Sequence, residues 1–222
     1  MALTTLDQDA AAQRLKMVNG QLRVCDVNDL DLLAAFLNAP REDFVAPDKA
    51  RFAYADSDQP SAGGPGRRLL APTVLGRLLQ AAEVKAGERG LDVCGGAGYG
   101  AAILGRLGVR VTALESDPGC AAAARERLGP TGIEVIEGDP AVWPKGRGPF
   151  DLIVVEGAFE ILPEVLLAEL SERGRLVGID ARQGASEAAL FERVGGGFGR
   201  RALFETRAAP LEAFRRMPGF AF

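Results

Sequence analysis

Histidine is absent from the 222-residue sequence. This absence excludes Ser-His and Cys-His nucleophile pairs, histidine general bases and metal sites with histidine ligands, and we expect no metal site. Only three cysteines are present, Cys25, Cys94 and Cys120, and none of them is part of a CxxC motif. Because an odd number of widely separated cysteines fits a reducing compartment better than a disulfide framework, we expect a cytoplasmic protein.

Long uncharged apolar runs are also missing. No stretch reaches the roughly 18 residues that a membrane span needs, so we expect no such span. The first residues, MALTTLDQDAAAQRLK, carry acids where a signal peptide would carry a basic and then an apolar run. Lysine supplies only four of the 26 basic residues, no polybasic block is present, and the net charge is −4. This pattern argues against general electrostatic binding to nucleic acid.

The composition is ordinary for a soluble globular protein, with 47% hydrophobic and 25% charged residues. A chain of this length buries a full core without disulfides or metal. We predict a single domain over residues 1–222. It divides into an N-terminal helical and loop region over 1–72, a central core over 73–180 and C-terminal strands over 181–222.

The first third of the chain combines helical patterns with a polar loop. Apolar residues recur at helical spacing over 15–25 and again over 30–37, and the second pattern stops near Pro40. Residues 56–68, DSDQPSAGGPGRR, contain almost no apolar side chain. This composition predicts a surface loop, and long loops in compact domains are often functional or mobile.

From residue 73 onward, helix and strand patterns alternate. Helices are predicted over 73–84, 99–107, 118–128 and 163–170, and strands over 90–94, 109–115, 133–139, 150–156 and 174–180. This alternation predicts an α/β fold: a doubly wound, mostly parallel sheet with helices on both faces. In the tail, a glycine-rich turn joins two further predicted strands, over 187–194 and 200–208.

A glycine-rich turn follows the first strand of this core, in LDVCGGAGYGAA (91–102). Such a turn lets a ligand approach bare backbone, and the helix after it points unpaired N–H groups at that ligand. The segment from Gly96 to Ala101 also satisfies GxGxxA, a weak match to a dinucleotide fingerprint. Asp92, however, sits inside the strand, where an NAD site normally has apolar residues. Its carboxylate can accept a hydrogen bond from a ligand ammonium group.

Two more acids follow the next two strands. Glu115, beside Ser116, closes the second strand. Its carboxylate can accept hydrogen bonds from both hydroxyls of a ribose, so it indicates a nucleoside cofactor without showing which one. Asp139, after Gly138, follows the third strand, where an adenine amino group would lie. Taken alone, Glu115 could be a solvated strand end and Asp139 the start of a turn. Together with Asp92, they lie at the carboxyl ends of three consecutive strands, the usual ligand edge of such a sheet.

The cofactor region resembles the first two motifs of class I S-adenosylmethionine-dependent methyltransferases, in LDVCGGAGYG and VTALESDP. The pattern D-x-x-x-G-x-G places Asp92, Gly96 and Gly98, with Cys94 where many members carry another glycine. The resemblance implies a Rossmann-like fold and S-adenosyl-L-methionine as cofactor. The implied binding residues are Asp92, Cys94, Gly96, Gly98, Glu115, Ser116, Gly138 and Asp139.

Five further segments are similar, in order and spacing, to those of the protein-L-isoaspartate O-methyltransferases. They are MVNGQLRV (17–24), APREDFVAPDKARFAYADSDQP (39–60), GDPAVWP (138–144), FDLIVVEGAFEILPEVLLAEL (150–170) and GRLVGID (174–180). The resemblance implies a protein-repair enzyme that transfers a methyl group to a carboxylate of damaged protein, with an isoaspartyl peptide or protein as its partner. A carboxylate is already nucleophilic at neutral pH, so this reaction is compatible with the absence of histidine.

The chain departs from that family where the methyl is transferred. Active members carry a T-I-S-Q-P-like segment with a hydroxyl residue at the transfer site, and aligning its proline with Pro72 puts Leu70 at the hydroxyl position. We therefore assign no catalytic residue. Arg67 or Arg68 could hold a carboxylate instead, or both could be solvated. We expect residues 57–67 to lie over the cofactor and to become ordered when it binds.

Two alternatives remain open at this stage. The first is a descendant of the family that binds the same cofactor but has lost or changed its isoaspartyl activity. The second is an NAD-dependent oxidoreductase, which is disfavoured because the chain has no histidine, no YxxxK pair and an aspartate in the first strand.

Overall fold

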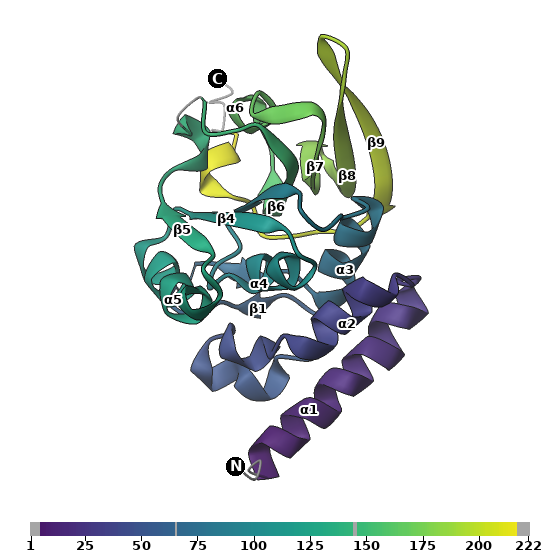
Figure 1. Cartoon of the computed structure of the whole chain (residues 1–222), viewed down its shortest axis with the longest axis vertical. Coiled ribbons are helices and arrows are strands. Elements are labelled where there is room, and N and C mark those ends of the chain that lie inside the picture. Colours follow the sequence, from purple (N-terminus) through teal and green to yellow (C-terminus); the bar gives the residue numbers. More distant parts are fainter. Residues whose placement is uncertain (1–4, 65, 144–145, 217–222) are drawn as a thin grey trace, which may run out of the picture.

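The centre of the molecule is a seven-stranded mixed sheet, drawn as arrows in Figure 1. The computed structural model describes residues 5–64, 66–143 and 146–216. Parallel strands run in the order β5-β4-β3-β6-β7, and antiparallel β8 and β9 extend the β7 edge. The strands are β3 Arg89–Val93, β4 Arg110–Glu115, β5 Glu134–Glu137, β6 Phe150–Phe159, β7 Leu170–Gln183, β8 Ala185–Val194 and β9 Gly197–Glu205. The predicted α/β fold with a C-terminal strand pair is confirmed.

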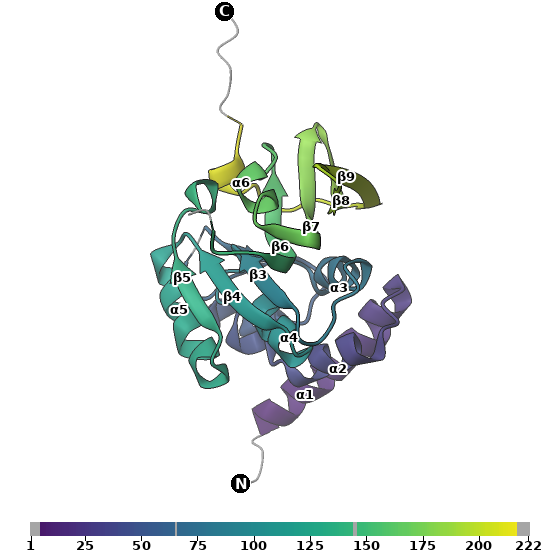
Figure 2. The same cartoon turned by 45° about the horizontal axis from the view of Figure 1, so that its top comes forward.

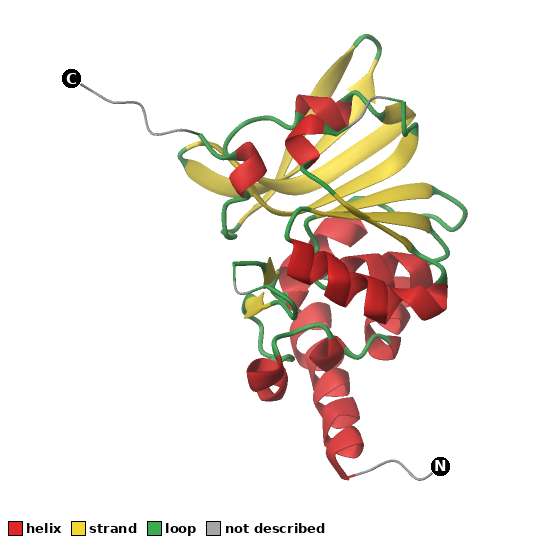
Figure 3. Ribbon diagram, turned by 90° about the vertical axis from the view of Figure 1, so that its left-hand side faces the viewer, coloured by secondary structure: helices red, strands yellow, loops and turns green. Residues whose placement is uncertain are grey.

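Helices cover both faces of the sheet, but very unequally (Figure 3). One face carries α2 Leu30–Asn38, α3 Pro72–Ala81, α4 Tyr99–Arg106 and α5 Pro118–Leu128, with α1 Thr5–Met17 packed outside them. Among the described residues, the other face carries the short helix α6 Glu164–Leu167 and the 3-10 turns η6 Pro140–Val142 and η7 Glu212–Phe214. The chain between β5 and β6 spans only residues 138–149, which is close to the shortest crossover that parallel strands allow.

Each face of the sheet has its own apolar core. The first core joins sheet residues such as Val154 and Val177 to α2, α3, α4 and α5. The second core joins Val155 and Phe191, which point the opposite way, to Leu166 of α6 and the η7 turn. Successive strand residues point to opposite faces, so the apolar strands of this sheet serve both cores.

The N-terminal region is helical as predicted, and its loop contains a short strand pair. After α1 come the π turn η1 Val18–Leu22 and the 3-10 turn η2 Arg23–Cys25, and after α2 come the 3-10 turns η3 Arg41–Asp43 and η4 Pro47–Phe52. Within the predicted loop, β1 Gln59–Pro60 pairs antiparallel with β2 Arg68–Leu69. Figures 1 and 2 place α1 and the β8–β9 pair at opposite ends of the molecule. Among the described residues, no helix is both long and apolar enough to cross a membrane.

One predicted helix is shorter than its sequence pattern suggests. We predicted a helix over 163–170, but α6 ends at Leu167 and β7 begins at Leu170. Leu170 pairs with Phe150 of β6, so Leu170 belongs to the sheet and the helix ends before it. The predicted strand over 150–156 likewise continues to Phe159 as part of β6.

Candidate functional site

A tight left-handed turn connects β3 to α4. Cys94, Gly96 and Gly98 have φ angles of +60°, +62° and +91°, which glycine adopts at no steric cost. A Cβ atom on Gly96 would also overlap the Ser61 hydroxyl oxygen. Glycine at position 96 is therefore required both by the backbone conformation and by the close approach of the segment that precedes α3.

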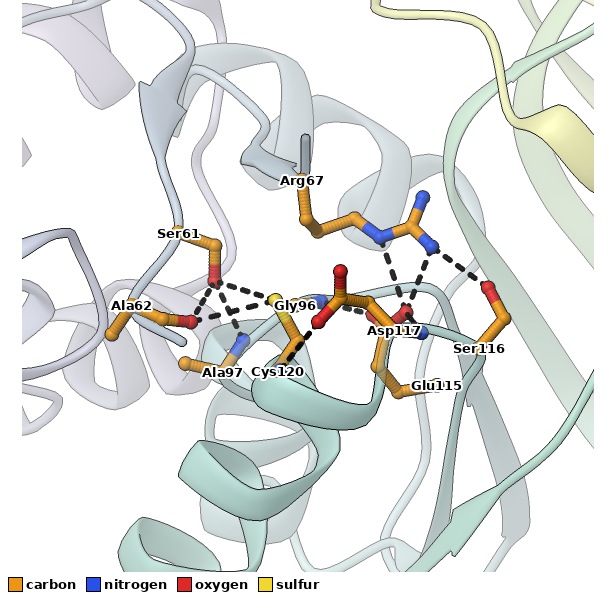
Figure 4. A network of polar contacts seen from close by, with 9 residues as sticks. All are labelled: Ser61, Ala62, Arg67, Gly96, Ala97, Glu115, Ser116, Asp117 and Cys120. Carbon is orange, nitrogen blue, oxygen red and sulfur yellow. Dashed lines mark hydrogen bonds and ion pairs between the residues drawn. The ribbon is translucent and has the colours of Figure 1, made fainter. Parts of the chain in front are cut away.

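Glu115 lies at the carboxyl end of β4, beside this turn, and its side chain is 2% exposed. Its Oε2 accepts a hydrogen bond from the Gly96 amide (2.9 Å), and its Oε1 accepts one from the Asp117 amide (2.9 Å). Oε1 also accepts hydrogen bonds from Nη2 (2.8 Å) and Nε (3.2 Å) of Arg67. Arg67 Nη2 donates in addition to Ser116 Oγ, at 2.9 Å (Figure 4). Arg67 is thus the residue that holds a carboxylate, and this carboxylate belongs to the protein itself.

Apart from residue 65, which lies outside the described residues, the segment over 61–67 approaches the glycine turn, and Figure 4 shows its Ser61 and Arg67 side chains beside Ala97 and Glu115. Ser61 Oγ accepts a hydrogen bond from the Ala97 amide at 2.9 Å. Gly63 packs so closely against the Gly119 carbonyl that a Cβ atom there would overlap it. Ser61 and Gly63 therefore lie against the turn and the first residues of α5. Whether residues 57–67 lie over a bound cofactor stays a prediction. Ser61 was not predicted, because no local pattern sets it apart from its neighbours in the loop.

Asp92 of β3 and Glu156 of β6 form a buried pair of acids. Their residues are 1% and 2% exposed. Asp92 pairs with Val154 across the two parallel strands, and Glu156 is two residues further along β6, so both side chains point to the same face. Asp92 Oδ2 accepts a hydrogen bond from the Ala101 amide of α4 at 3.0 Å. Asp92 Oδ1 and both Glu156 oxygens have no hydrogen-bond partner among the described residues.

Burial is the main cause that raises the pKa of Asp92 well above its usual value, and the neighbouring Glu156 raises it further. Burial also raises the pKa of Glu156. Burial and the neighbouring acid both oppose ionisation, so the pKa values of the two carboxyl groups lie above their usual range. Glu156 was absent from the predicted site. The sequence does offer a signal for Glu156, because an acid follows the apolar run FDLIVV at the end of a predicted strand. In the sheet this strand is β6, the neighbour of the strand that holds Asp92.

Leu70 and Glu156 line one small cleft. Its other lining residues are Asp58, Gly66, Arg67, Arg68, Gly157, Ala208, Ala209, Pro210 and Leu211. The free volume is about 10 Å³, roughly that of one water molecule. This free volume is too small for a peptide side chain.

The neighbours of Leu70 offer no replacement for the expected hydroxyl. Arg41 Nη2 donates to the Leu70 carbonyl at 2.7 Å, but the leucine side chain has no donor. The Thr73 hydroxyl, three residues away, is within 2.7 Å of an Asp56 carboxylate oxygen. Arg68 is exposed, and its Nη2 donates to a backbone carbonyl of the loop at 2.6 Å.

The remaining predicted residues have local structural roles. Asp139 is exposed and its Oδ1 accepts from the Ala141 amide at 2.9 Å, which caps the turn η6. The Gly138 amide donates to the Glu115 carbonyl at 3.0 Å and so ties β5 to β4. Cys94 is buried, and burial raises the pKa of its thiol to about 12. Cys94 is therefore a protonated, small core residue rather than a nucleophile.

Comparison with known proteins identifies the class. The family model described as protein-L-isoaspartate (D-aspartate) O-methyltransferase matches residues 14–210. The protein-L-isoaspartate O-methyltransferase of Methylorubrum extorquens (strain PA1) is 39% identical over 172 residues, which are 76% of this chain and 74% of the relative. The one from Gloeobacter violaceus is 34% identical over 200 residues, 88% and 96% of the two chains. The chain belongs to the protein-L-isoaspartate O-methyltransferase family, as the sequence motifs suggested.

Two solved structures share the fold of this chain. A protein-L-isoaspartate O-methyltransferase superposes with a TM-score of 0.77 at 23% identity. The match covers 89% of this chain and 65% of that protein. A second, from Plasmodium falciparum in complex with S-adenosyl-L-homocysteine, gives a TM-score of 0.76 at 20% identity and covers 89% and 97% of the two chains. At these identities the likeness shows that the fold is shared.

Proposed function

We propose that the protein binds S-adenosylmethionine at the glycine turn and transfers its methyl group to an isoaspartyl carboxylate of a damaged peptide or protein. The observation that carries the proposal is the arrangement of acids around that turn. Glu115 and Asp92 stand at the carboxyl ends of adjacent parallel strands, with Gly96 and Gly98 between them. Membership of the family supports the reaction and the acceptor.

The residues present fit this cofactor. Asp92 has an unpartnered buried oxygen that suits an ammonium group, and the missing side chain of Gly96 leaves room for close approach to the backbone. Glu115 would accept the two ribose hydroxyls in place of Arg67, beside Ser116. Gly138 and Asp139 would face the adenine. Gly98 would allow the backbone of the turn, and Cys94 would place only a small side chain where the turn begins. The bound cofactor supplies a methyl group on a sulfonium, which an oriented carboxylate can attack without a base.

The division of the chain is part of the same proposal. Residues 73–180 would hold the cofactor, residues 1–72 would cap it through the segment over 61–67, and residues 181–222 would complete the sheet. We also propose a cytoplasmic location, which the three free cysteines support.

A second candidate keeps the cofactor and changes the acceptor. Leu70 offers no donor to an acceptor carboxylate, and the acids Asp58 and Glu156 line the same cleft. An acceptor carboxylate placed there would meet these two acids beside the guanidinium groups of Arg67 and Arg68. These contacts favour a family member whose methyl acceptor differs from isoaspartate or whose isoaspartyl activity is weak.

One assay separates the two candidates. The purified protein is incubated with S-adenosylmethionine carrying a labelled methyl group and an isoaspartyl peptide, with the matching aspartyl peptide as control. Labelled methyl ester on the isoaspartyl peptide alone supports the first candidate. Cofactor binding without any such ester supports the second.

A further inference from the structure

The buried pair of Asp92 and Glu156 places two acids where the methyltransferase motif accounts for one. Both carboxyl groups converge on the glycine turn. A Cβ atom on Gly95 would lie 2.5 Å from Asp92 Oδ2 and 3.0 Å from Glu156 Oε1. A Cβ atom on Gly100 would overlap Glu156 Oε1 and lie 3.2 Å from Asp92 Oδ1. The pair therefore lies against both ends of the turn, and any side chain at these two glycines would displace it.

The described part of the chain leaves this pair without a direct cation. The buried guanidinium of Arg41 lies nearby. Its Nε and Nη2 donate hydrogen bonds to the carbonyls of Ala53 and Leu70, at 2.8 and 2.7 Å. Its Nη1 has no hydrogen-bond partner among residues 5–64, 66–143 and 146–216, and neither do three of the four oxygens of the acid pair. A buried charge without a hydrogen-bonded partner is unfavourable, so this pair is incomplete on its own.

We propose that Glu156 is a second cofactor-binding acid, which joins Asp92 in holding the α-ammonium group of S-adenosylmethionine. This inference rests on the proposed cofactor. An ammonium group brings three N–H donors and one positive charge. The acid pair offers three buried oxygens without a hydrogen-bond partner among the described residues, Asp92 Oδ1 and both Glu156 oxygens. The ammonium group would supply N–H donors and a positive charge to these oxygens, which lowers the cost of burying the two acids.

Glu156 also lines the cleft beside Leu70, so the cationic nitrogen could instead belong to a methyl acceptor. The two sources are distinguished by removing the ammonium from the cofactor. S-adenosylhomocysteine is compared with its analogue in which hydrogen replaces the α-amino group. Both ligands are titrated calorimetrically into the full-length wild-type protein, into Glu156→Gln and into Glu134→Gln, a matched change of an exposed glutamate at the start of β5.

Wild-type protein is expected to bind S-adenosylhomocysteine at least about tenfold more tightly than the deamino analogue, the low end for a charged hydrogen bond. Glu156→Gln should weaken S-adenosylhomocysteine by about tenfold or more and leave the analogue within about twofold. Glu134→Gln should behave as wild type. This selective loss is a coupling between one side chain and one group of the ligand, which a merely structural role of Glu156 would not produce.

Glu156→Gln would overturn the proposal if it weakened both ligands equally or weakened neither. If it weakened neither ligand but abolished methyl transfer in the peptide assay, Glu156 would be assigned to the acceptor. If circular dichroism shows that Glu156→Gln does not fold, Asp92→Asn takes its place with the same expected selectivity, and equal wild-type affinity for the two ligands refutes the idea. Failure of wild-type protein to bind S-adenosylhomocysteine at all would instead refute the proposed function on which this inference rests.

Discussion

Replacing Arg67 with alanine should tighten the binding of the cofactor. Arg67 donates two hydrogen bonds to the carboxylate of Glu115 that we assign to the ribose hydroxyls. On this assignment, the cofactor and Arg67 compete for the same carboxylate. In Arg67→Ala the same carboxylate keeps its hydrogen bonds from the Gly96 and Asp117 amides and is otherwise free for the ligand.

The size of the effect follows from the contacts that are lost. Arg67 makes two hydrogen bonds to Glu115 Oε1, at 2.8 and 3.2 Å, with side chains that are only 14% and 2% exposed. A hydrogen bond to a charged group contributes about 1.5–3 kcal/mol. The unliganded protein should lose about this amount of stability, and its Tm should fall by roughly 3–12 °C for a chain of this size. Since the complex loses little, affinity should rise by about 10- to 100-fold.

Calorimetric titration with S-adenosylhomocysteine measures this gain, and thermal unfolding without ligand measures the accompanying loss. Arg68→Ala is the matched control, because Arg68 is the neighbouring residue and does not contact Glu115. Its affinity should equal that of wild type. A weaker affinity in Arg67→Ala would refute the reasoning, because it would mean that Arg67 moves to hold the bound cofactor rather than competing with it.

Three further predictions follow from the site. Leu70→Ser should raise turnover on isoaspartyl peptides and leave cofactor affinity within about tenfold, the 1.4 kcal/mol step; unchanged turnover in a peptide methylation assay would show that one hydroxyl does not restore the site. Amides over 61–67 should exchange hydrogen more slowly once S-adenosylhomocysteine is bound, and slow exchange there without ligand would contradict a lid role. Because the pKa values of Asp92 and Glu156 are raised in the folded state, their stabilising contribution is complete below the usual carboxyl pKa near 4 and is lost as the pH rises through their raised values. The free energy of unfolding, measured in urea, should therefore fall less steeply between about pH 4 and pH 8 in Glu156→Gln than in wild type.

The sequence allowed the fold and half of the site to be predicted, because these features depend on local patterns. Alternating apolar strands and helices predict the parallel sheet, and the glycine turn with Asp92 on one side predicts the ligand edge. Glu115 was predicted for the same reason, since it closes an apolar strand. Each single strand, helix or turn in these patterns is marked by residues that are close together in the sequence.

The other half of the site depends on residues that are far apart in the sequence. The contact of Arg67 with Glu115 spans 48 positions, and nothing in the glycine-rich loop indicates which of its two arginines turns inward. Glu156 comes next to Asp92 only because β6 pairs with β3, and strand order was not predicted. The short α6 has the same origin, because Leu170 pairs with Phe150 instead of extending the helix.

One titration tests most directly whether Glu115 is an acceptor for a nucleoside. S-adenosylhomocysteine and NAD are each titrated into wild-type protein and into Glu115→Ala. We predict that S-adenosylhomocysteine binds wild type, that NAD gives no binding heat, and that Glu115→Ala weakens S-adenosylhomocysteine by about 1.5–3 kcal/mol. Tight binding of NAD, or an affinity for S-adenosylhomocysteine that does not depend on Glu115, would contradict this prediction.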